Sequence, residues 1–302
     1  MIYHKAIYVY LMLSTTNLSI NRVVSFRLLN LRSLVLVACM LQLVGCSISS
    51  LMFYPYKQLP VTPDKLGLQY EKINHTSADG TKLVSWWLPS AKVGVAKGTI
   101  LYLHGNAQNI SYHQFNVGWL PSQGYNVLML GYRQFGESEG IAKLPNIFLD
   151  VHAGLDWIIE NKASNKIFIL GQSMGASLGV FGLASYSQSD KVDGVILDAV
   201  FDSYPGIAAH AMSQNWFTWP FQLITYSMGT DYDPELWIQQ WPDNMPLLMM
   251  HSQQDQVIPY HKGRRVFELA REPKQWVENT GPHIATFKYL EMRQSLLKFI
   301  AQ

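Results

Sequence analysis

The sequence predicts an α/β domain with an open, mostly parallel central sheet flanked by helices. Short apolar runs with few polar interruptions predict strands buried on both faces, as in a parallel sheet covered by helices. Segments of helical pattern separate these runs, and an antiparallel hairpin precedes them, so strands and helices alternate along the chain. The five apolar runs span residues 98–105, 125–132, 166–173, 192–200 and 245–252.

The first 45 residues predict a signal segment rather than part of the folded domain. The apolar run 34–45 is too short for a membrane span, because crossing ~30 Å of hydrocarbon takes ~20 apolar residues. Arg22, Arg27 and Arg32 precede this run, and no acidic residue occurs before position 46. A basic region, a short apolar region and small residues at its end are typical of a secretory signal. The alternative is a buried strand with an incidental cysteine.

The last residues of this segment, LVGC ending at Cys46, resemble the lipobox of bacterial lipoproteins. The resemblance implies that Cys46 carries lipid, that cleavage occurs just before it, and that the protein is anchored in the bacterial cell envelope. Because Ser47 and not Asp follows the cysteine, it further implies the outer membrane, facing the periplasm. Since signals usually span about 15–30 residues, we expect translation to start later, near residues 23–28. The alternative is a long basic region.

Composition limits the partners of the part that follows Cys46. Four of the 23 basic residues precede Cys46 and all 21 acidic residues follow it, so this part is slightly acidic. It has no run of Lys or Arg, the electrostatic footprint of nucleic-acid binding. Both cysteines, Cys39 and Cys46, lie in or at the end of the signal, so the body depends on core burial instead of disulfides. We expect no metal and no organic cofactor, because the sequence has no motif for either.

Residues 46–63 predict a lipid anchor and tether. They lack a clear period and contain prolines, which is typical of a linking segment. Three aromatic residues near the expected anchor could rest at a membrane interface, or they could pack on the domain. These are Phe53, Tyr54 and Tyr56.

Residues 64–302 predict one α/β domain. Strand patterns at 68–76 and 81–89, around an Ala-Asp-Gly turn, predict the antiparallel hairpin. In open α/β sheets, ligands bind at the carboxyl ends of the strands. We therefore expect the functional residues on loops that follow strands. The helical segments are 144–162, 174–188, 260–272 and 284–302.

The candidate nucleophile is Ser173, the central residue of a G-x-S-x-G at 171–175. The pentapeptide alone is a weak signal, but an apolar strand comes before it and a helix rich in small residues follows. A sharp strand-to-helix turn lifts a serine hydroxyl above the sheet, and glycines on either side relieve the crowding. The context therefore favours a nucleophilic serine.

A serine nucleophile needs a base, and the base needs an orienting acid. In this arrangement the order along the chain is serine, then acid, then histidine. Asp255 lies on the loop after the apolar run 245–252, and His283 lies on the last loop before the final helix. We therefore predict Asp255 as the acid and His283 as the base. The alternatives are His261 as base and Asp198 or Asp202 as acid.

The attacked carbonyl also needs hydrogen-bond donors for its developing oxyanion, each worth ~3 kcal/mol in comparable sites. One predicted donor is the backbone N–H of Met174, directly after the nucleophile. The other is the backbone N–H of Asn106, on the loop after the run 98–105. We expect His104 and His251 to shape their loops rather than to carry protons.

Residues 203–244 predict a small lid between two strands of the sheet. The segment holds four of the nine tryptophans, with phenylalanines beside them. An aromatic face of this kind can cover an acyl or aromatic group of a substrate. The alternative is a set of helices packed on the sheet, with the aromatic side chains in the core. The expected lid residues are Trp216, Phe217, Trp219 and Phe221.

Five motifs in order resemble the serine-hydrolase branch of the α/β-hydrolase superfamily, particularly small membrane-associated hydrolases and their bacterial lipoprotein relatives. The motifs are HGNAQN, GYRQFGESEG, GQSMG, HSQQDQVIP and GPHIATF. The resemblance runs from about Leu59 to the C-terminus, and it implies a hydrolase fold and ester-type chemistry. One departure is Gly131-Tyr132-Arg133-Gln134, where family members often have Asp-Tyr-Arg-Gly, so the role of Arg133 stays open.

The predicted function is that of a lipid-anchored serine hydrolase that cleaves carboxylic esters or thioesters with a Ser-His-Asp triad. Its expected partners are a small ester or acyl substrate and, through Cys46, a membrane. One alternative is a serine peptidase or amidase on the same fold. The other is a catalytically idle lipoprotein that binds a ligand, because one fold hosts many functions.

Overall fold

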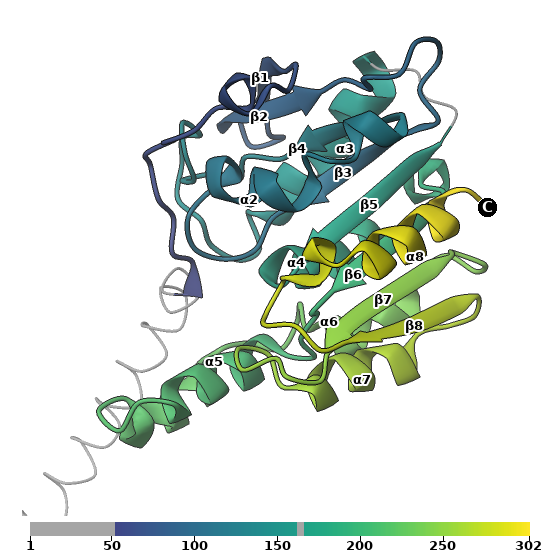
Figure 1. Cartoon of the computed structure of the whole chain (residues 1–302). Coiled ribbons are helices and arrows are strands. Elements are labelled where there is room, and N and C mark those ends of the chain that lie inside the picture. Colours follow the sequence, from purple (N-terminus) through teal and green to yellow (C-terminus); the bar gives the residue numbers. More distant parts are fainter. Residues whose placement is uncertain (1–51, 162–165) are drawn as a thin grey trace, which may run out of the picture. The chain divides into compact units, whose positions relative to one another are not determined.

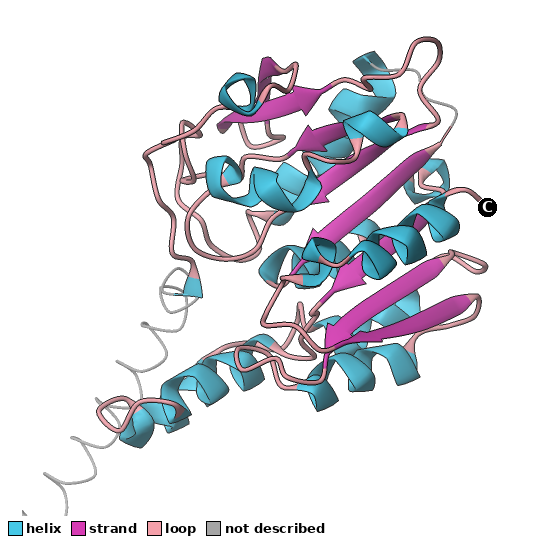
Figure 2. Ribbon diagram, viewed as in Figure 1, coloured by secondary structure: helices cyan, strands magenta, loops and turns pink. Residues whose placement is uncertain are grey.

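The computed structural model describes residues 52–161 and 166–302, which form an open eight-stranded sheet with helices on both faces (Figures 1 and 2). The strands are β1 (Glu71–Thr76), β2 (Lys82–Leu88), β3 (Gly98–Leu103), β4 (Tyr125–Met129), β5 (Ile167–Gln172), β6 (Gly194–Asp198), β7 (Leu247–Ser252) and β8 (Lys274–Asn279). Their order is β1-β2-β4-β3-β5-β6-β7-β8, with the pairs β1/β2 and β2/β4 antiparallel and the others parallel. The prediction of a mostly parallel α/β sheet after an antiparallel hairpin is confirmed.

The helices lie between the strands, as the alternating pattern predicts. The α-helices are α2 (Ile110–Val117), α3 (Phe148–Asn161), α4 (Met174–Ala184), α5 (Tyr204–Ser213), α6 (Pro234–Trp237), α7 (Tyr260–Leu269) and α8 (Leu290–Ile300). The 3₁₀ segments are η2 (Pro63–Leu66), η3 (Pro121–Gln123), η4 (Ser189–Lys191), η5 (Trp219–Ser227), η6 (Ile238–Gln240) and η7 (Thr286–Lys288). No helix within these described ranges is both long and apolar enough to cross a membrane.

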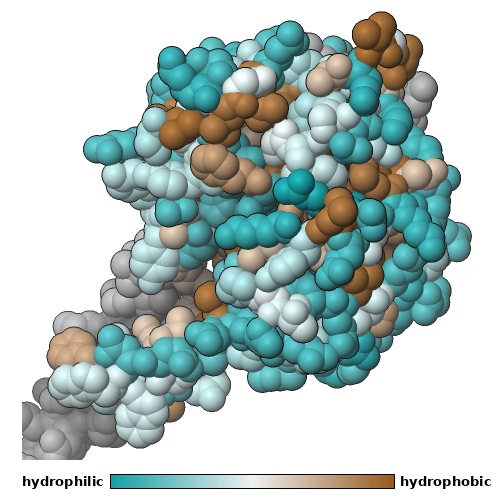
Figure 3. Space-filling view, viewed as in Figure 1, coloured by the Kyte–Doolittle hydropathy of each residue, from teal (hydrophilic) through white to brown (hydrophobic). Residues whose placement is uncertain are grey.

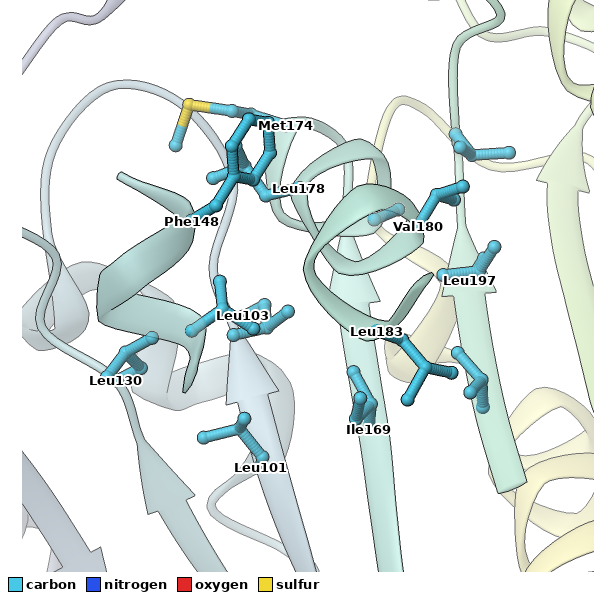
Figure 4. Packing of buried hydrophobic residues seen from close by; sticks show 14 of the residues in the cluster. Leu101, Leu103, Leu130, Phe148, Ile169, Met174, Leu178, Val180, Leu183 and Leu197 are labelled. Carbon is cyan, nitrogen blue, oxygen red and sulfur yellow. The ribbon is translucent and has the colours of Figure 1, made fainter. Parts of the chain in front are cut away.

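Two hydrophobic clusters lie on opposite faces of the sheet, because successive side chains of a strand point to opposite sides. In β3, Leu101 and Leu103 belong to the cluster under α3 and α4, whereas Ile100 and Tyr102 belong to the cluster under α2 and α8. Figure 4 shows α4 packed on the first face, with Leu183 near Ile169 of β5 and with Leu178 beside Phe148 of α3. Burial on both faces explains why these strands are nearly continuous apolar runs.

The start of α4 lies in direct contact with the end of β3, and Gly175 makes this approach possible. A Cβ at Gly175 would lie 2.0 Å from the carbonyl oxygen of Leu103 and 2.6 Å from that of His104. Both atoms belong to the backbone, so they cannot move aside as a flexible side chain could. The second glycine of the G-x-S-x-G motif is therefore required by packing.

Replacing Gly175 with Ala should destabilise the domain by more than ~3 kcal/mol, because overpacking here strains the backbone of a central strand. The matched control is Gly179→Ala in the same helix, where the nearest atom to a new Cβ is Leu103 Cδ1 at 3.3 Å. That change should be close to neutral, because the preference of alanine over glycine in a helix, ~1 kcal/mol, offsets the cost of this tight side-chain contact. Urea unfolding of both variants measures the difference, and equal losses at the two positions would contradict this packing argument.

The α5–η5 hairpin, residues 204–227, extends away from the sheet. Its two segments pack mainly on each other, and Figures 1 and 2 show α5 reaching outward from the edge where the parallel strands end. The chain then returns through α6 and η6 to β7. The predicted excursion between two strands at 203–244 therefore comprises a projecting hairpin and a returning segment.

The described part of the predicted tether packs on the domain. Phe53 is buried in the core, whereas Tyr54 and Tyr56 are exposed. Tyr56 also donates its N–H to the carbonyl of Gln108 at 3.2 Å. The signal segment 1–45, Cys46 and the possible later start lie outside the described residues, so these expectations stay predictions.

Candidate active site

Ser173 occupies a sharp turn between the last residue of β5 and the first residue of α4. Its backbone has φ 56° and ψ −122°, a combination that costs a non-glycine residue of order 1–3 kcal/mol. Its N–H donates to the carbonyl of Asp198 at 2.8 Å, which helps to hold the turn. The hydroxyl therefore stands at the carboxyl edge of the sheet, as the G-x-S-x-G context predicts.

Three predicted residues form one chain of hydrogen bonds at this edge. His283 Nε2 lies 2.9 Å from Ser173 Oγ, and His283 Nδ1 lies 2.7 Å from Asp255 Oδ2. An ionised carboxylate only accepts, so Nδ1 carries the proton toward Asp255 and Nε2 accepts from the serine hydroxyl. Both distances lie within the range for proton transfer between heavy atoms. The arrangement can therefore withdraw a proton from the serine.

Asp255 is held in place from its other side by the backbone. Its Oδ1 accepts from the N–H groups of Val257 and Ile258, at 2.8 and 2.9 Å. Burial alone would raise the pKa of Asp255, but the hydrogen bond and charge of His283 and the two backbone donors outweigh burial and lower it. The carboxylate is therefore ionised at neutral pH and points one oxygen at His283.

The alternative acids have other partners. Asp198 is fully buried and accepts from Gln172 Nε2 at 2.7 Å and from Thr286 Oγ1 at 2.8 Å. Burial raises the pKa of Asp198 to about 6, although these two donors oppose the shift. Asp202 accepts from Lys262 Nζ at 2.8 Å. The structure thus brings Asp255, and neither alternative, into hydrogen-bond contact with His283.

Among the described residues, none of the other histidines near the site is hydrogen-bonded to Ser173 Oγ. His261 lies exposed in the first turn of α7. His251 is buried, with Nε2 3.0 Å from the carbonyl of Ile258. His104 is also buried, with Nδ1 2.8 Å from the carbonyl of Gly105, and burial holds its pKa well below the usual range. The positions of His104 and His251 agree with the expected structural roles.

The two predicted oxyanion donors lie on segments next to Ser173. The N–H of Met174 is the first of α4, where a helix offers no internal acceptor. The loop after β3 runs beside the nucleophile, because a Cβ at Gly105 would lie 3.5 Å from Ser173 Cβ. Asn106 is the next residue on this loop, and its backbone N–H stays the predicted second donor.

The Asn106 side chain has a contact that the sequence did not predict. Its Nδ2 donates to the carbonyl of Met52 at 2.6 Å, and its Oδ1 accepts from the N–H of Tyr54 at 3.0 Å. The side chain therefore ties the start of the described chain to the candidate oxyanion loop. Pairing between segments so far apart in sequence leaves no local pattern.

The four expected lid residues lie exposed on the α5–η5 hairpin. Trp216, Phe217, Trp219 and Phe221 are all more than half exposed. The alternative of aromatic side chains in the core therefore fails for these four. It does hold for Trp241 of the returning segment, which is buried and donates its Nε1–H to the carbonyl of Val180 at 2.9 Å. The role of the exposed residues as a substrate lid stays a prediction.

Arg133, whose role the sequence left open, lies in a buried ion-pair network. Its guanidinium is bound to Asp150 and Asp79, each with a closest N–O distance of 2.7 Å. Its Nη2 also donates to Ser77 Oγ at 3.1 Å. These contacts join the loop after β4 to the β1–β2 turn and to α3, so Arg133 holds the fold together.

A buried polar network beneath Ser173 was missed by the sequence analysis. Gln172 Oε1 accepts from the hydroxyl of Tyr102 at 2.6 Å and from Asn116 Nδ2 at 2.8 Å. Its Nε2 continues the network to Asp198, and from there to Thr286, three residues after His283. The polar residues Gln172 and Asp198 at the ends of apolar strands were the available signal.

Replacing Asp198 with Asn should change how stability depends on pH. The folded protein keeps a proton on this carboxyl up to about pH 6, whereas an unfolded aspartate has an ordinary pKa of 3.8. The resulting stabilisation is complete below the unfolded value and is lost as pH rises through the folded one. Wild type should therefore gain unfolding free energy relative to Asp198→Asn on going from about pH 7 to about pH 5. Urea unfolding measures this, and parallel pH profiles of the two proteins would contradict it.

The chain is similar in sequence to one protein family model and to relatives in bacteria and animals. A family model described as serine aminopeptidase, S33, matches residues 94–231, a range that includes Ser173 and ends before Asp255. The YfhR protein of Salmonella typhimurium is 31% identical over 282 residues, covering 88% of this chain and 92% of YfhR. The lysophosphatidylserine lipase ABHD12 of Rattus norvegicus is 28% identical, covering 57% of this chain and 45% of that protein.

A solved structure supports the fold independently. The Pyrococcus furiosus esterase Pf2001 superimposes with a TM-score of 0.69 at 20% identity, covering 82% of this chain and 97% of the esterase. The similarity thus extends over nearly the whole of that smaller protein.

Proposed function

The chain belongs to the α/β-hydrolase superfamily, and from this premise we propose that it is a serine hydrolase of carboxylic esters or thioesters. One observation carries the proposal, the hydrogen-bond chain from Ser173 Oγ through His283 to Asp255. A serine is a poor nucleophile at neutral pH unless a positioned base removes its proton. In this proposal His283 is that base, and Asp255 is the acid that orients it.

The proposed reaction begins when Ser173 Oγ attacks the substrate carbonyl and its proton passes to His283 Nε2. Asp255 stabilises the imidazolium that forms, without itself taking the proton. The N–H groups of Met174 and Asn106 would hold the oxyanion, where preorganised donors act most strongly. The bond to the leaving group then breaks as His283 Nε2 returns the proton to the departing oxygen or sulfur.

The remaining acyl-enzyme is cleaved by water through the same groups. His283 takes a proton from the water, whose oxygen attacks the acyl carbon. The bond between the acyl carbon and Ser173 Oγ then breaks as the proton passes from His283 to Oγ. The products are a carboxylic acid and an alcohol or thiol, with the enzyme regenerated. Every step uses groups of this chain and one water molecule.

A serine peptidase or amidase is the second candidate, and the description of the matching family model favours it. The lipase name of the ABHD12 relative favours ester cleavage. Purified protein should be labelled by a fluorophosphonate, and it should then be assayed on p-nitrophenyl esters of graded length and on aminoacyl p-nitroanilides. Labelling without hydrolysis of any ester would contradict the ester proposal, and absence of labelling would favour an idle binding protein.

We also propose that Cys46 carries the lipid anchor of the mature protein and that this anchor holds the protein in the bacterial cell envelope. The support is the lipobox-like sequence at the end of a basic and then apolar segment. Two or more acyl chains anchor a protein firmly, whereas one chain binds marginally. Mass spectrometry of the mature N-terminus tests the proposal, and an unmodified Cys46 within a longer chain would contradict it.

A further inference from the structure

The α5–η5 hairpin carries a cluster of exposed apolar side chains. Six large ones are exposed, and Trp216 and Tyr226 reach 86% and 81%. Of the nine tryptophans, all of which the structure describes, Trp216 and Trp219 are the two classed as exposed. Figure 3 shows the hairpin protruding from the body of the domain. The exposed residues are Trp216, Phe217, Trp219, Phe221, Leu223 and Tyr226.

The same segment has no formal charge. Residues 203–230 contain no Asp, Glu, Lys or Arg, although 15% of the whole chain is charged. At that average a segment of this length would carry about four charged residues. A protruding, solvent-facing hairpin without charge is unfavourable in water but suits the boundary between water and lipid, where Trp and Tyr rings are enriched.

The hairpin follows the carboxyl end of a parallel strand, and the start of the described chain is bound at the same end of the sheet. α5 follows β6, and Asn106 follows β3, which lies two strands from β6 in the parallel part of the sheet. Asn106 binds Met52, and Met52 stands six residues after Cys46. Six extended residues span at most ~20 Å. A lipid on Cys46 would therefore hold this edge close to a bilayer.

We propose that the exposed side chains of the hairpin contact the surface of a lipid bilayer, so that the active-site edge faces the membrane. The substrates are then amphiphilic esters that enter from the lipid phase. This substrate class rests on the proposed ester hydrolysis, and the choice of a bilayer as partner rests in part on the proposed lipid at Cys46. A lipid surface fits better than a protein partner, because the segment offers no charge to pair and lies at the edge that a lipid on Cys46 would hold near a bilayer.

The contact can be tested with the full chain reconstituted in phosphatidylcholine vesicles with brominated acyl chains. Bromine quenches tryptophan fluorescence at short range, so Trp216 and Trp219 should be quenched relative to plain vesicles. The variant Leu223→Asp with Tyr226→Asp keeps both tryptophans and places charge on the contact surface. It should lose at least half of the quenching.

The matched control is Val93→Asp with Val95→Asp, two exposed apolar residues on the loop before β3, at the opposite edge of the sheet. This variant should keep the quenching of wild type. Quenching that is absent in wild type, or equal in both double variants, would overturn the proposal. Either result is expected if the hairpin binds a second copy of this chain or closes over the substrate and does not contact the bilayer.

Activity assays separate this proposal from the proposed function. The Leu223→Asp, Tyr226→Asp variant should hydrolyse a soluble short ester within about two-fold of wild type, and a long-chain ester embedded in vesicles at least ten-fold more slowly. Equal losses on both substrates would overturn the substrate class. Quenching without hydrolysis of any ester by wild type would reject the proposed function and leave the membrane contact standing.

Discussion

Ser173→Ala is expected to lower kcat for ester hydrolysis by roughly 10⁴–10⁶, because the members of a triad act as a unit. Removing Oγ leaves His283 without a nucleophile to activate, and water is a poor replacement at this position. The side chain is small and its described hydrogen bond is to His283, so the fold should be unchanged. Steady-state kinetics on p-nitrophenyl esters measures the loss.

The control for this prediction is the unfolding free energy of the variant, which should lie within about 1 kcal/mol of wild type. A fluorophosphonate should label wild type and fail to label the variant. Retained ester hydrolysis in a folded Ser173→Ala protein would show that another group performs the attack. The proposed function would then be wrong, although the fold would be unaffected.

Asp255→Asn is expected to lower kcat by about 10³–10⁴. The carboxylate oxygen Oδ1 already accepts from the N–H groups of Val257 and Ile258. The single carbonyl oxygen of an amide should keep those two bonds, which turns its NH₂ group toward His283. His283 would then have to accept at Nδ1 and carry its proton on Nε2, the tautomer that cannot take a proton from Ser173.

Asp198→Asn provides the comparison, because Asp198 is bonded to Gln172 and Thr286 rather than to His283. Its effect on kcat should be smaller than that of Asp255→Asn by at least ten-fold. The reverse ranking would assign the orienting role to Asp198. Both variants should be assayed at the same pH, since Asp198 titrates near pH 6.

Much of the fold could be predicted from sequence because it depends on local pattern. Buried parallel strands must be apolar on both faces, and five such runs correspond to β3 to β7. Asp255 and His283 were predicted from the order serine, acid, histidine and from their positions on loops that follow strands, and the structure brings these three side chains together. Their catalytic roles stay predictions.

Contacts between distant segments could not be predicted. The Asn106 bonds to Met52 and Tyr54 join residues about fifty positions apart, and no period or spacing marks them. The sequence also could not distinguish a hairpin that projects from one that packs. Exposed Trp216 and buried Trp241 lie within the same predicted lid segment, residues 203–244.

The contact between Gly175 and the end of β3 constrains the backbone of the turn, but it does not constrain which side chain residue 173 carries. Backbone atoms of Leu103 and His104 exclude any side chain at position 175, whereas nothing in that contact depends on the atom that position 173 carries. The turn therefore fixes the position of the nucleophilic atom but does not determine whether that atom is oxygen or sulfur. Ser173→Cys would put sulfur where oxygen stands, on an unchanged backbone and beside the same imidazole. A lineage with this turn can exchange its nucleophile in one step, but it cannot give up the glycine without rebuilding the sheet.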